Sequence, residues 1–217
     1  MEQFIDAFIT SIPVFSQGLI NTLSLTGLTL IFSVILGLIV LGLKVSRFRV
    51  LNWIANTYLA IVRGVPLIAL LFVIYFGIVS IIRVDAFTAA TVGLSIHASA
   101  YMAEIFRSGL SSVPKGQTEA ARSLGLNRVR TLQKVVGPQA LRVVIPALVN
   151  QSIIALKDSS VAAFITVEEL FLTSQRIAAA TFQPLTYYLI VSVYYLAIVG
   201  LMTLFANRVE RYYGKRG

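Results

Sequence analysis

Long stretches of this chain carry no charged side chain, and that limits what it can fold into. No residue between Asp6 and Lys44 is charged, and the same holds from 64 to 82 and from 177 to 207. As a helix, the run from 64 to 82 is about 28 Å long, close to the thickness of a bilayer's hydrocarbon core. Only 12% of the residues are charged, whereas a soluble domain has about a quarter. The sequence therefore predicts an all-α polytopic membrane protein.

The charged residues divide the chain into five predicted membrane spans, at about 17–43, 64–82, 86–107, 143–167 and 177–207. Lysine and arginine concentrate after the first, third and fifth spans, whereas the opposite loops contain only Arg83 and Arg176. The positive-inside rule then places the N-terminus outside and the C-terminus in the cytoplasm. This topology accounts for the net charge of +9, so no nucleic-acid partner is expected.

The predicted cytoplasmic loop at 109–141 contains a short polar helix, 117–124. Gly125 follows it where a left-handed C-cap would end the helix. Asn127 is a suitable N-cap for a second short helix, which we expect to end before Pro138. An interfacial loop helix is the simpler interpretation, but such helices need length and an apolar face. The abrupt end at Gly125 instead favours a helix that docks into a soluble partner.

The residues of this loop also form a recognisable motif. Glu119, Ala120 and Ala121 are followed at fixed spacing by Gly125 and by the run Val135-x-Gly137-Pro138. This arrangement resembles the EAA loop of bacterial ABC importer permeases. That family's pattern ends in Ile-x-Leu-Pro, so Val135 is a mild departure and Gly137 a larger one. The small Ala120 and Ala121 would let another backbone approach closely, and Glu119 adds a charge beside them.

Other stretches are similar to the polar-amino-acid branch of this family, and together they cover residues 22–211. They are "RGVPLI" from Arg63, "IYFG" from Ile74, "SAYMAEIFRSG" from Ser99, "PQALR" from Pro138 and "LKDSS" from Leu156. The resemblance implies the type I ABC importer permease fold in a single transmembrane domain, 1–217, in the bacterial plasma (inner) membrane. It also implies a coupling role for the loop residues Gln117, Glu119, Ala120, Ala121 and Gly125.

The resemblance further implies a set of partners. These are a second permease subunit, identical or homologous, two cytoplasmic ATPase subunits, and an extracytoplasmic binding protein. The binding protein would deliver a cystine-, glutamine- or basic-amino-acid-type substrate. The chain has no G-x-x-x-x-G-K-[ST] run, so we expect no cofactor in this chain. ATP and magnesium would bind the partner ATPase subunits, and this chain would be a transport subunit and not an enzyme.

Three polar residues of the third span share one helix face. His97, Tyr101 and Glu104 lie at positions i, i+4 and i+7, which suits a substrate pathway or the seam of a dimer. Glu104 also has Arg107 three residues on, and we favour that structural ion pair. His97 equally suits a hydrogen-bonded core position. It is the single histidine of a chain without cysteine, so no metal site is predicted.

The fourth span is interrupted by Lys157 and Asp158, with Asn150 one heptad before the lysine. Neighbouring helix residues point about 100° apart, so these two charges do not simply neutralise each other. Together with Ser159 they offer donors and acceptors for a zwitterionic amino acid. Structural pairing explains the same residues, and Ser159 and Ser160 suit a local helix break in which their hydroxyls bond freed carbonyls.

Two other classes of protein compete with the permease. An ion-coupled secondary carrier would suit the charges at Lys157 and Asp158, but such a carrier has no use for an EAA loop. A membrane enzyme would need more than one histidine and a carboxylate-rich loop for hydrolysis or metal chemistry. The sequence therefore favours the ABC importer permease, with the secondary carrier as the alternative.

Overall fold

The computed structural model describes residues 2–79 and 83–214, and every regular element within them is helical. The elements run in the order α1 (Glu2–Lys44), α2 (Arg49–Gly64), α3 (Leu67–Val79), α4 (Ala86–Ser111), α5 (Lys115–Ser123), α6 (Arg128–Thr131), a π-helix (Leu132–Val136), α7 (Gly137–Asp158), a 3₁₀-helix (Ser159–Ile165), α8 (Leu170–Thr181) and α9 (Pro184–Gly214).

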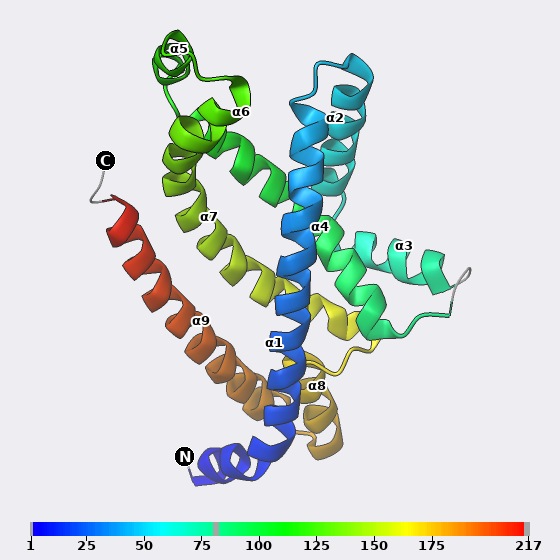
Figure 1. Ribbon diagram of the computed structural model, residues 1–217. Helices are drawn as coiled ribbons and strands as arrows, with labels where there is room; N and C mark the ends of the chain where they lie inside the picture. Colours follow the sequence, from blue (N-terminus) through cyan, green and yellow to red (C-terminus); the bar gives the residue numbers. More distant parts are fainter. Residues whose placement is uncertain (1, 80–82, 215–217) are drawn as a thin grey trace.

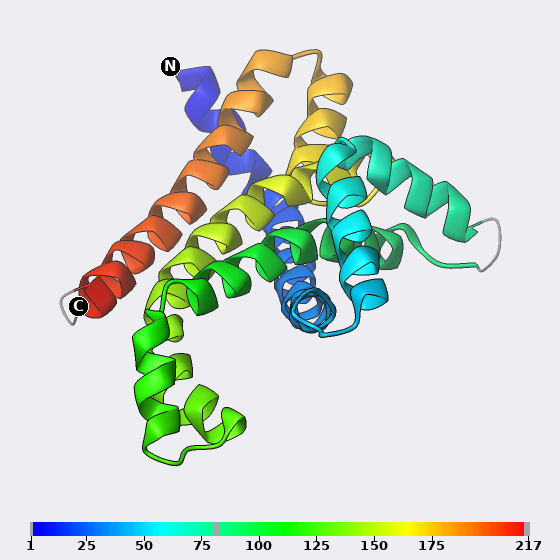
Figure 2. The same cartoon turned by 90° about the horizontal axis from the view of Figure 1, so that it is seen from above.

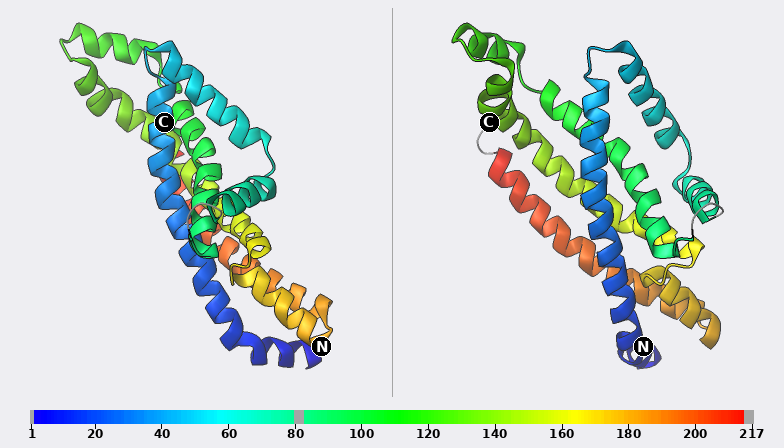
Figure 3. Two further views of the ribbon diagram at one scale, coloured as in Figure 1. Left: turned by 90° about the vertical axis from the view of Figure 1, so that its right-hand side faces the viewer. Right: turned by 45° about the vertical axis from the view of Figure 1, so that its right-hand side comes forward.

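Helix α4 lies at the centre of the bundle, against α1, α3 and α7 (Figure 1). Helix α1 is 43 residues long, about 64 Å, and therefore exceeds the thickness of a membrane. Its first turns run at an angle to the rest (Figure 3). Pro13 lies inside this part of the helix, and a proline removes a backbone hydrogen bond and favours such a bend.

The long helices α1 and α4 approach closely because small residues lie between them. A β-carbon added at Gly37 would lie 2.6 Å from the β-carbon of Met102 and 3.2 Å from the carbonyl oxygen of Ser99. The facing side of α4 is built from buried alanines, among them Ala100 and Ala103. Close packing of this kind positions the polar residues of α4 relative to α1.

Three helical stretches among the described residues are long and apolar enough to cross a membrane: Gln3–Lys44, Arg128–Ile165 and Pro184–Tyr213. The helices Arg49–Gly64 and Leu67–Gly77 meet the same criterion only as a pair bent by 109°, and counting the pair as one broken span gives four. Helix α4 is not among these stretches, because His97, Glu104, Arg107 and its serines, threonines and glycines lower its hydropathy.

The predicted second span, 64–82, differs from the structure. It is not one straight helix: α3 begins only at Leu67, and the chain turns sharply between α2 and α3. Val65 has an extended backbone (φ −92°, ψ 133°). Pro66 causes this, because a proline disfavours the helical conformation of the residue before it. Residues 80–82 of the predicted span lie outside the described residues.

A hairpin of α5 and α6 extends from one end of the bundle (Figures 1 and 2). We expected its second helix to end before Pro138, and this prediction is wrong. The helix continues from α6 through the π-helix into α7. Pro138 lies directly after the π-helix, in the first turn of α7, and the helical backbone passes through it.

Candidate functional site

The hairpin owes its shape to a complete C-cap after α5. Gly125 has φ +82°, and its N–H donates to the carbonyl of Arg122 at 2.9 Å. The N–H of Leu126 donates to the carbonyl of Ala121 at 3.2 Å. These two bonds form a Schellman motif, which requires the left-handed conformation that glycine adopts most easily. The predicted C-cap at Gly125 is confirmed.

The predicted N-cap of the second hairpin helix is also confirmed. The Asn127 side chain accepts a hydrogen bond from the N–H of Arg130 at 2.9 Å. Only two residues, Gly125 and Leu126, separate Asn127 from Leu124, the C-cap residue of α5. A helix end capped by glycine and a helix start capped by asparagine therefore fix a tight turn at the tip of the hairpin.

The predicted coupling residues divide by exposure. Gln117, Glu119 and Ala120 are exposed, whereas Ala121 is 4% exposed and packs against its own chain. Ala121 therefore offers no surface to a partner in this structure. Leu124 is 84% exposed at the end of α5, a large apolar side chain that the sequence analysis did not select. The hairpin thus presents both polar and apolar groups on its outer surface.

Glu104 lies in an ion-pair cluster at the hairpin end of α1 and α4. Its carboxylate lies 2.8 Å from Nε of Arg107, as the spacing predicted, and 2.5 Å from Nζ of Lys44. Lys44 is 60 positions away in the sequence, so only the packing of α1 against α4 reveals it. Two cationic partners make the structural interpretation of Glu104 the better one.

A cleft of about 480 Å³ opens beside this cluster, between α1, α2 and α4. It is lined by Lys44, Asn56, Arg63, Tyr101 and Glu104 together with small and apolar residues. The structure therefore brings two of the predicted pathway residues to one cleft and adds the cation Arg63 from α2. Arg63 belongs to the "RGVPLI" stretch.

His97 of α4 and Asp158 of α7 lie near enough for their charges to influence each other, without a direct ion pair between the two side chains. The Tyr101 ring lies beside the imidazole, with 5.2 Å between ring centroids. Among the described residues, Nδ1 of His97 is buried and has no hydrogen-bond partner. We expected that His97 could be a core histidine with its ring nitrogens hydrogen-bonded, and Nδ1 does not meet that expectation.

The remaining predicted pathway residues do not gather at one point. Lys157 and Asn150 are exposed, whereas Asp158 is half-buried. Ser159 is fully buried and donates to the carbonyl of Leu156 at 2.7 Å. Ser160 donates to the carbonyl of Lys157 at 2.7 Å. The predicted interruption takes the form of a change from α-helix to 3₁₀-helix at Ser159, with the chain helical through Ile165, and both hydroxyls bond carbonyls of the last α-helical turn.

A second polar centre, missed by the sequence analysis, lies at the opposite end of the bundle. Glu169 is 0% exposed and caps α8, accepting from the N–H groups of Phe171 and Leu172 at 2.8 Å each. Tyr195 of α9 donates its hydroxyl to the same carboxylate at 2.9 Å. On α1, Thr22 accepts from the N–H of Leu170 at 3.0 Å. Burial raises the pKa of the Glu169 carboxyl to about 7.

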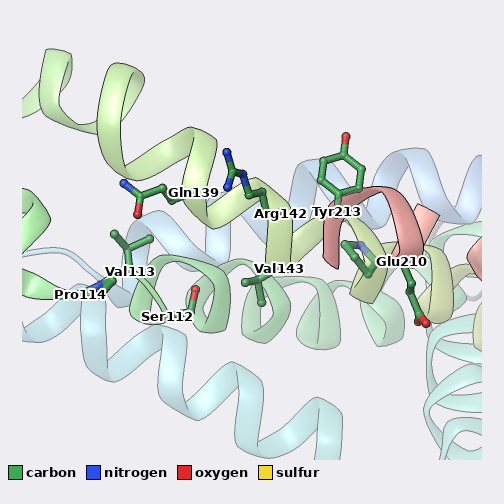
Figure 4. Close-up of a pocket in the computed structure, with 9 residues that line it drawn as sticks. Ser112, Val113, Pro114, Gln139, Arg142, Val143, Glu210 and Tyr213 are labelled. Atoms are coloured by element: carbon green, nitrogen blue, oxygen red, sulfur yellow. The ribbon is translucent and has the colours of Figure 1, made fainter. Parts of the chain in front are cut away.

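A groove of about 460 Å³ lies at the base of the hairpin, between residues 112–114, α7 and the end of α9. Figure 4 shows Arg142 and Tyr213 pointing away from Glu210. The polar groups labelled there do not converge on one point. The groove therefore separates the hairpin's base from α9 and does not form a compact polar site.

Several apolar helices suited to a membrane, with a capped hairpin projecting from one end, define a polytopic membrane protein that presents a hairpin outside its bundle. A family model described as "Binding-protein-dependent transport system inner membrane component" matches residues 30–215. The chain belongs to this family. It is a permease subunit of an ABC importer, with the type I permease fold, and a multi-pass protein of the inner membrane.

Named relatives support the assignment. The probable amino-acid ABC transporter permease protein YckA of Bacillus subtilis (strain 168) is 38% identical over 206 residues, which is 94% of this chain and 91% of that protein. The L-cystine transport system permease protein TcyB of the same organism is 38% identical over 201 residues, 92% and 86% of the two chains. The glutamine transport system permease protein GlnP of Escherichia coli (strain K12) is 35% identical over 204 residues, 93% of each chain.

Solved structures agree with this fold. A chain from a crystal structure of an amino acid ABC transporter with histidines has a TM-score of 0.90 and 34% identity, with 95% of this chain and 97% of that chain covered. A chain of the MetNI methionine ABC transporter in an inward-facing conformation has a TM-score of 0.81 at 23% identity, with 94% and 98% covered. The latter likeness concerns the fold alone. Neither the family nor these relatives support an ion-coupled carrier.

Proposed function

We propose that this permease imports a polar amino acid of the cystine, glutamine or basic type, delivered by an extracytoplasmic binding protein. The names of the relatives support this substrate class, since they include cystine, glutamine and arginine permeases. In the complex, a second permease subunit, identical or homologous, pairs with this chain. Two ATPase subunits bind ATP and magnesium and hydrolyse the ATP.

The proposed topology has five spans, with the N-terminus outside and the hairpin and C-terminus in the cytoplasm. Helix α4 is one of the five, and α1, α3 and α7 pack around it. The bent pair α2–α3 is proposed as a further span. The chain has no cysteine, so single cysteines report the topology cleanly. A cysteine at Glu168 should react with an impermeant thiol reagent from outside, and one at Lys115 should not; labelling of Lys115 in intact cells would overturn the assignment.

The hairpin is the proposed coupling element, with Gln117, Glu119, Ala120 and Gly125 in direct or supporting roles. Its exposed residues and its rigid caps suit docking into a groove of the ATPase subunit. Ala121 contributes by packing the hairpin internally. When ATP closes the ATPase dimer, the docked hairpins move with it and the spans switch between inward- and outward-facing states.

The proposed substrate pathway follows α4 and the end of α7. Asp158 and His97 form its central polar pair, and Tyr101 connects this pair to the cleft beside Glu104. Asn150 and Lys157 are exposed in the single chain, where a second permease subunit or a substrate can reach them. Ser159 and Ser160 shape the pathway indirectly, through the helix break that positions Asp158.

The test is uptake by proteoliposomes that contain the permease, its ATPase subunits and its binding protein. We expect cystine, glutamine or arginine to enter only with ATP inside, and an ion gradient alone to drive no uptake. Uptake driven by an ion gradient without ATP would refute the proposal.

A second arm tests the pathway residue Asp158. If Asp158 binds the substrate's ammonium group, Asp158→Asn raises the substrate concentration that half-stimulates ATP hydrolysis and leaves assembly unchanged. If Asp158 only neutralises a buried cation, the same change strands that charge, at about 3–5 kcal/mol. Poor assembly at every substrate concentration would then remove Asp158 from the pathway.

A further inference from the structure

The hairpin is joined to α7 by a π-helix, Leu132–Val136. The N–H of Gly137 donates to the carbonyl of Leu132, five residues back, where an α-helix would bond four residues back. A π turn accommodates one extra residue. Each residue of an α-helix advances the chain by about 100°, so one extra residue changes the rotational register between the hairpin and α7 by about that angle.

Gly137 is the residue that permits this turn. A β-carbon at position 137 would lie 2.6 Å from the carbonyl oxygen of Leu132. The obstacle is a backbone atom of the same turn, so it cannot move aside as the tip of a side chain can. The departure from Ile-x-Leu-Pro at this position therefore has a structural counterpart, because the π turn leaves no room for a β-carbon at residue 137.

Gln139 connects the two sides of the turn. Its side-chain Nε2 donates to the carbonyl of Val135 at 3.0 Å, inside the π-helix. The same nitrogen lies 3.5 Å from Oε1 of Gln117 in α5. One side chain at the start of α7 thus contacts both the turn and the hairpin helix that the coupling proposal relies on.

Helix α7 continues from this turn to the helix break at the opposite end. Asp158, which interacts with His97 of α4, is its last residue. The rotational position of α7 therefore determines which side of α4 this carboxylate faces. A change of register at Gly137 is carried along α7 toward Asp158, since the helix runs from Gly137 to Asp158 with Pro146 as its internal proline.

We propose that Gly137 and Gln139 are positioning residues for coupling: the π turn holds the hairpin and α7 in one rotational register, so that a displaced hairpin moves α7 as a unit. This rests on the proposed function of the hairpin as the docking element. It adds that transmission depends on the register of a specific turn and not on the presence of the hairpin alone.

The test uses the assembled complex with Gly137→Ala. The added methyl group forces the turn toward α-helical geometry, and we expect uptake per ATP hydrolysed to fall about tenfold while basal hydrolysis stays unchanged. Spin labels on cysteines at Arg122 and Val143 should report a change of several ångströms in their separation. Gly200→Ala in α9 is the matched control, since an added β-carbon there has no neighbour within 4 Å.

A milder variant keeps the test decisive if Gly137→Ala does not assemble. Gln139→Met keeps the length of the side chain and removes the amide that donates to Val135, and it should lower coupling by a smaller factor. Gln133→Met, an exposed glutamine of the same turn, should leave coupling unchanged. Normal coupling in Gly137→Ala, or in Gln139→Met where the former fails to assemble, overturns the inference. A wild-type complex whose hydrolysis ignores the loaded binding protein would refute the proposed function instead.

Discussion

The two ends of the bundle differ in how far they expose their side chains. The end with the hairpin exposes its residues, with Leu124 84% exposed, and joins the bundle through a π turn. The end with α8 is closed around Glu169, which is 0% exposed and accepts three hydrogen bonds. A part that transmits motion needs surface and a defined joint, whereas the part it moves against needs fixed contacts. The contrast predicts that the α8 end is the more stable of the two ends.

The glycines show the same contrast. A β-carbon added at Gly116 in the hairpin would have no neighbour within 4 Å. A β-carbon added at Gly18 would lie 2.7 Å from Oγ1 of Thr173 and 3.3 Å from the backbone of Leu170. In the hairpin, Gly125 is needed for its positive φ and Gly116 has room for a side chain, whereas Gly18 is needed for the close approach of α1 to α8.

The largest expected effect is at the tip of the hairpin. Gly125→Val places a β-branched residue at φ +82°, so the Schellman motif opens and the docking surface shifts. We expect substrate-stimulated ATP hydrolysis to fall at least about tenfold while the subunit still inserts and pairs. Gly200→Val is the control in α9. Near-normal stimulation in Gly125→Val would break the comparison, because the hairpin's shape would then not matter.

The next effect concerns the closed end. Glu169→Ala leaves two α8 N–H groups and the Tyr195 hydroxyl without their acceptor, at a cost of about 2–4 kcal/mol. The thermal unfolding midpoint of the purified complex measures this loss. Its neighbour Glu168 forms an exposed ion pair with Arg176, so Glu168→Ala should cost less than about 1 kcal/mol. Equal losses in both variants would contradict a rigid centre at Glu169.

A pair of glycine substitutions sharpens the contrast. Gly18→Ala must push α1 from α8 and should lower stability by about 1–3 kcal/mol. Gly116→Ala meets open space and should raise the stability of α5 by about 0.5 kcal/mol. Both changes add one methyl group, so unfolding midpoints compare the two ends directly. Tolerance of Gly18→Ala would show that the α1–α8 contact is loose.

The smallest effect is a pH dependence of the closed end. The pKa of the Glu169 carboxyl is raised from 4.5 to about 7 in the fold, so the folded state holds the proton more tightly than the unfolded chain. This contribution to stability is fully present below about pH 4.5 and is lost as the pH rises through about 7. Between pH 6 and 7 the loss should be about 1 kcal/mol.

Glu169→Gln removes the titration and is the control for that measurement. Its unfolding midpoint should change less between pH 6 and 7 than that of the wild-type complex. An identical pH profile in the two proteins would show that Glu169 does not titrate in this range.

The chain alone determined much of this protein. Its uncharged runs required helices in a membrane, because backbone groups in hydrocarbon must bond within their own segment. The local sequence was also enough to predict the turn at the tip of the hairpin, since the positive φ of Gly125 and the N-cap of Asn127 depend on adjacent residues. The i, i+3 pair of Glu104 with Arg107 was predictable for the same reason.

The tertiary structure decided whatever depends on distant residues or on competition between local signals. The uncharged run from 64 to 82 contained Pro66, and the proline prevailed over apolarity and bent the chain at Val65. Lys44 joins Glu104, and Tyr195 joins Glu169, because helices far apart in sequence pack together. The π turn at Gly137 likewise became visible only in the fold: a glycine in the sequence shows that a side chain is missing, but only the surrounding backbone shows what occupies its place.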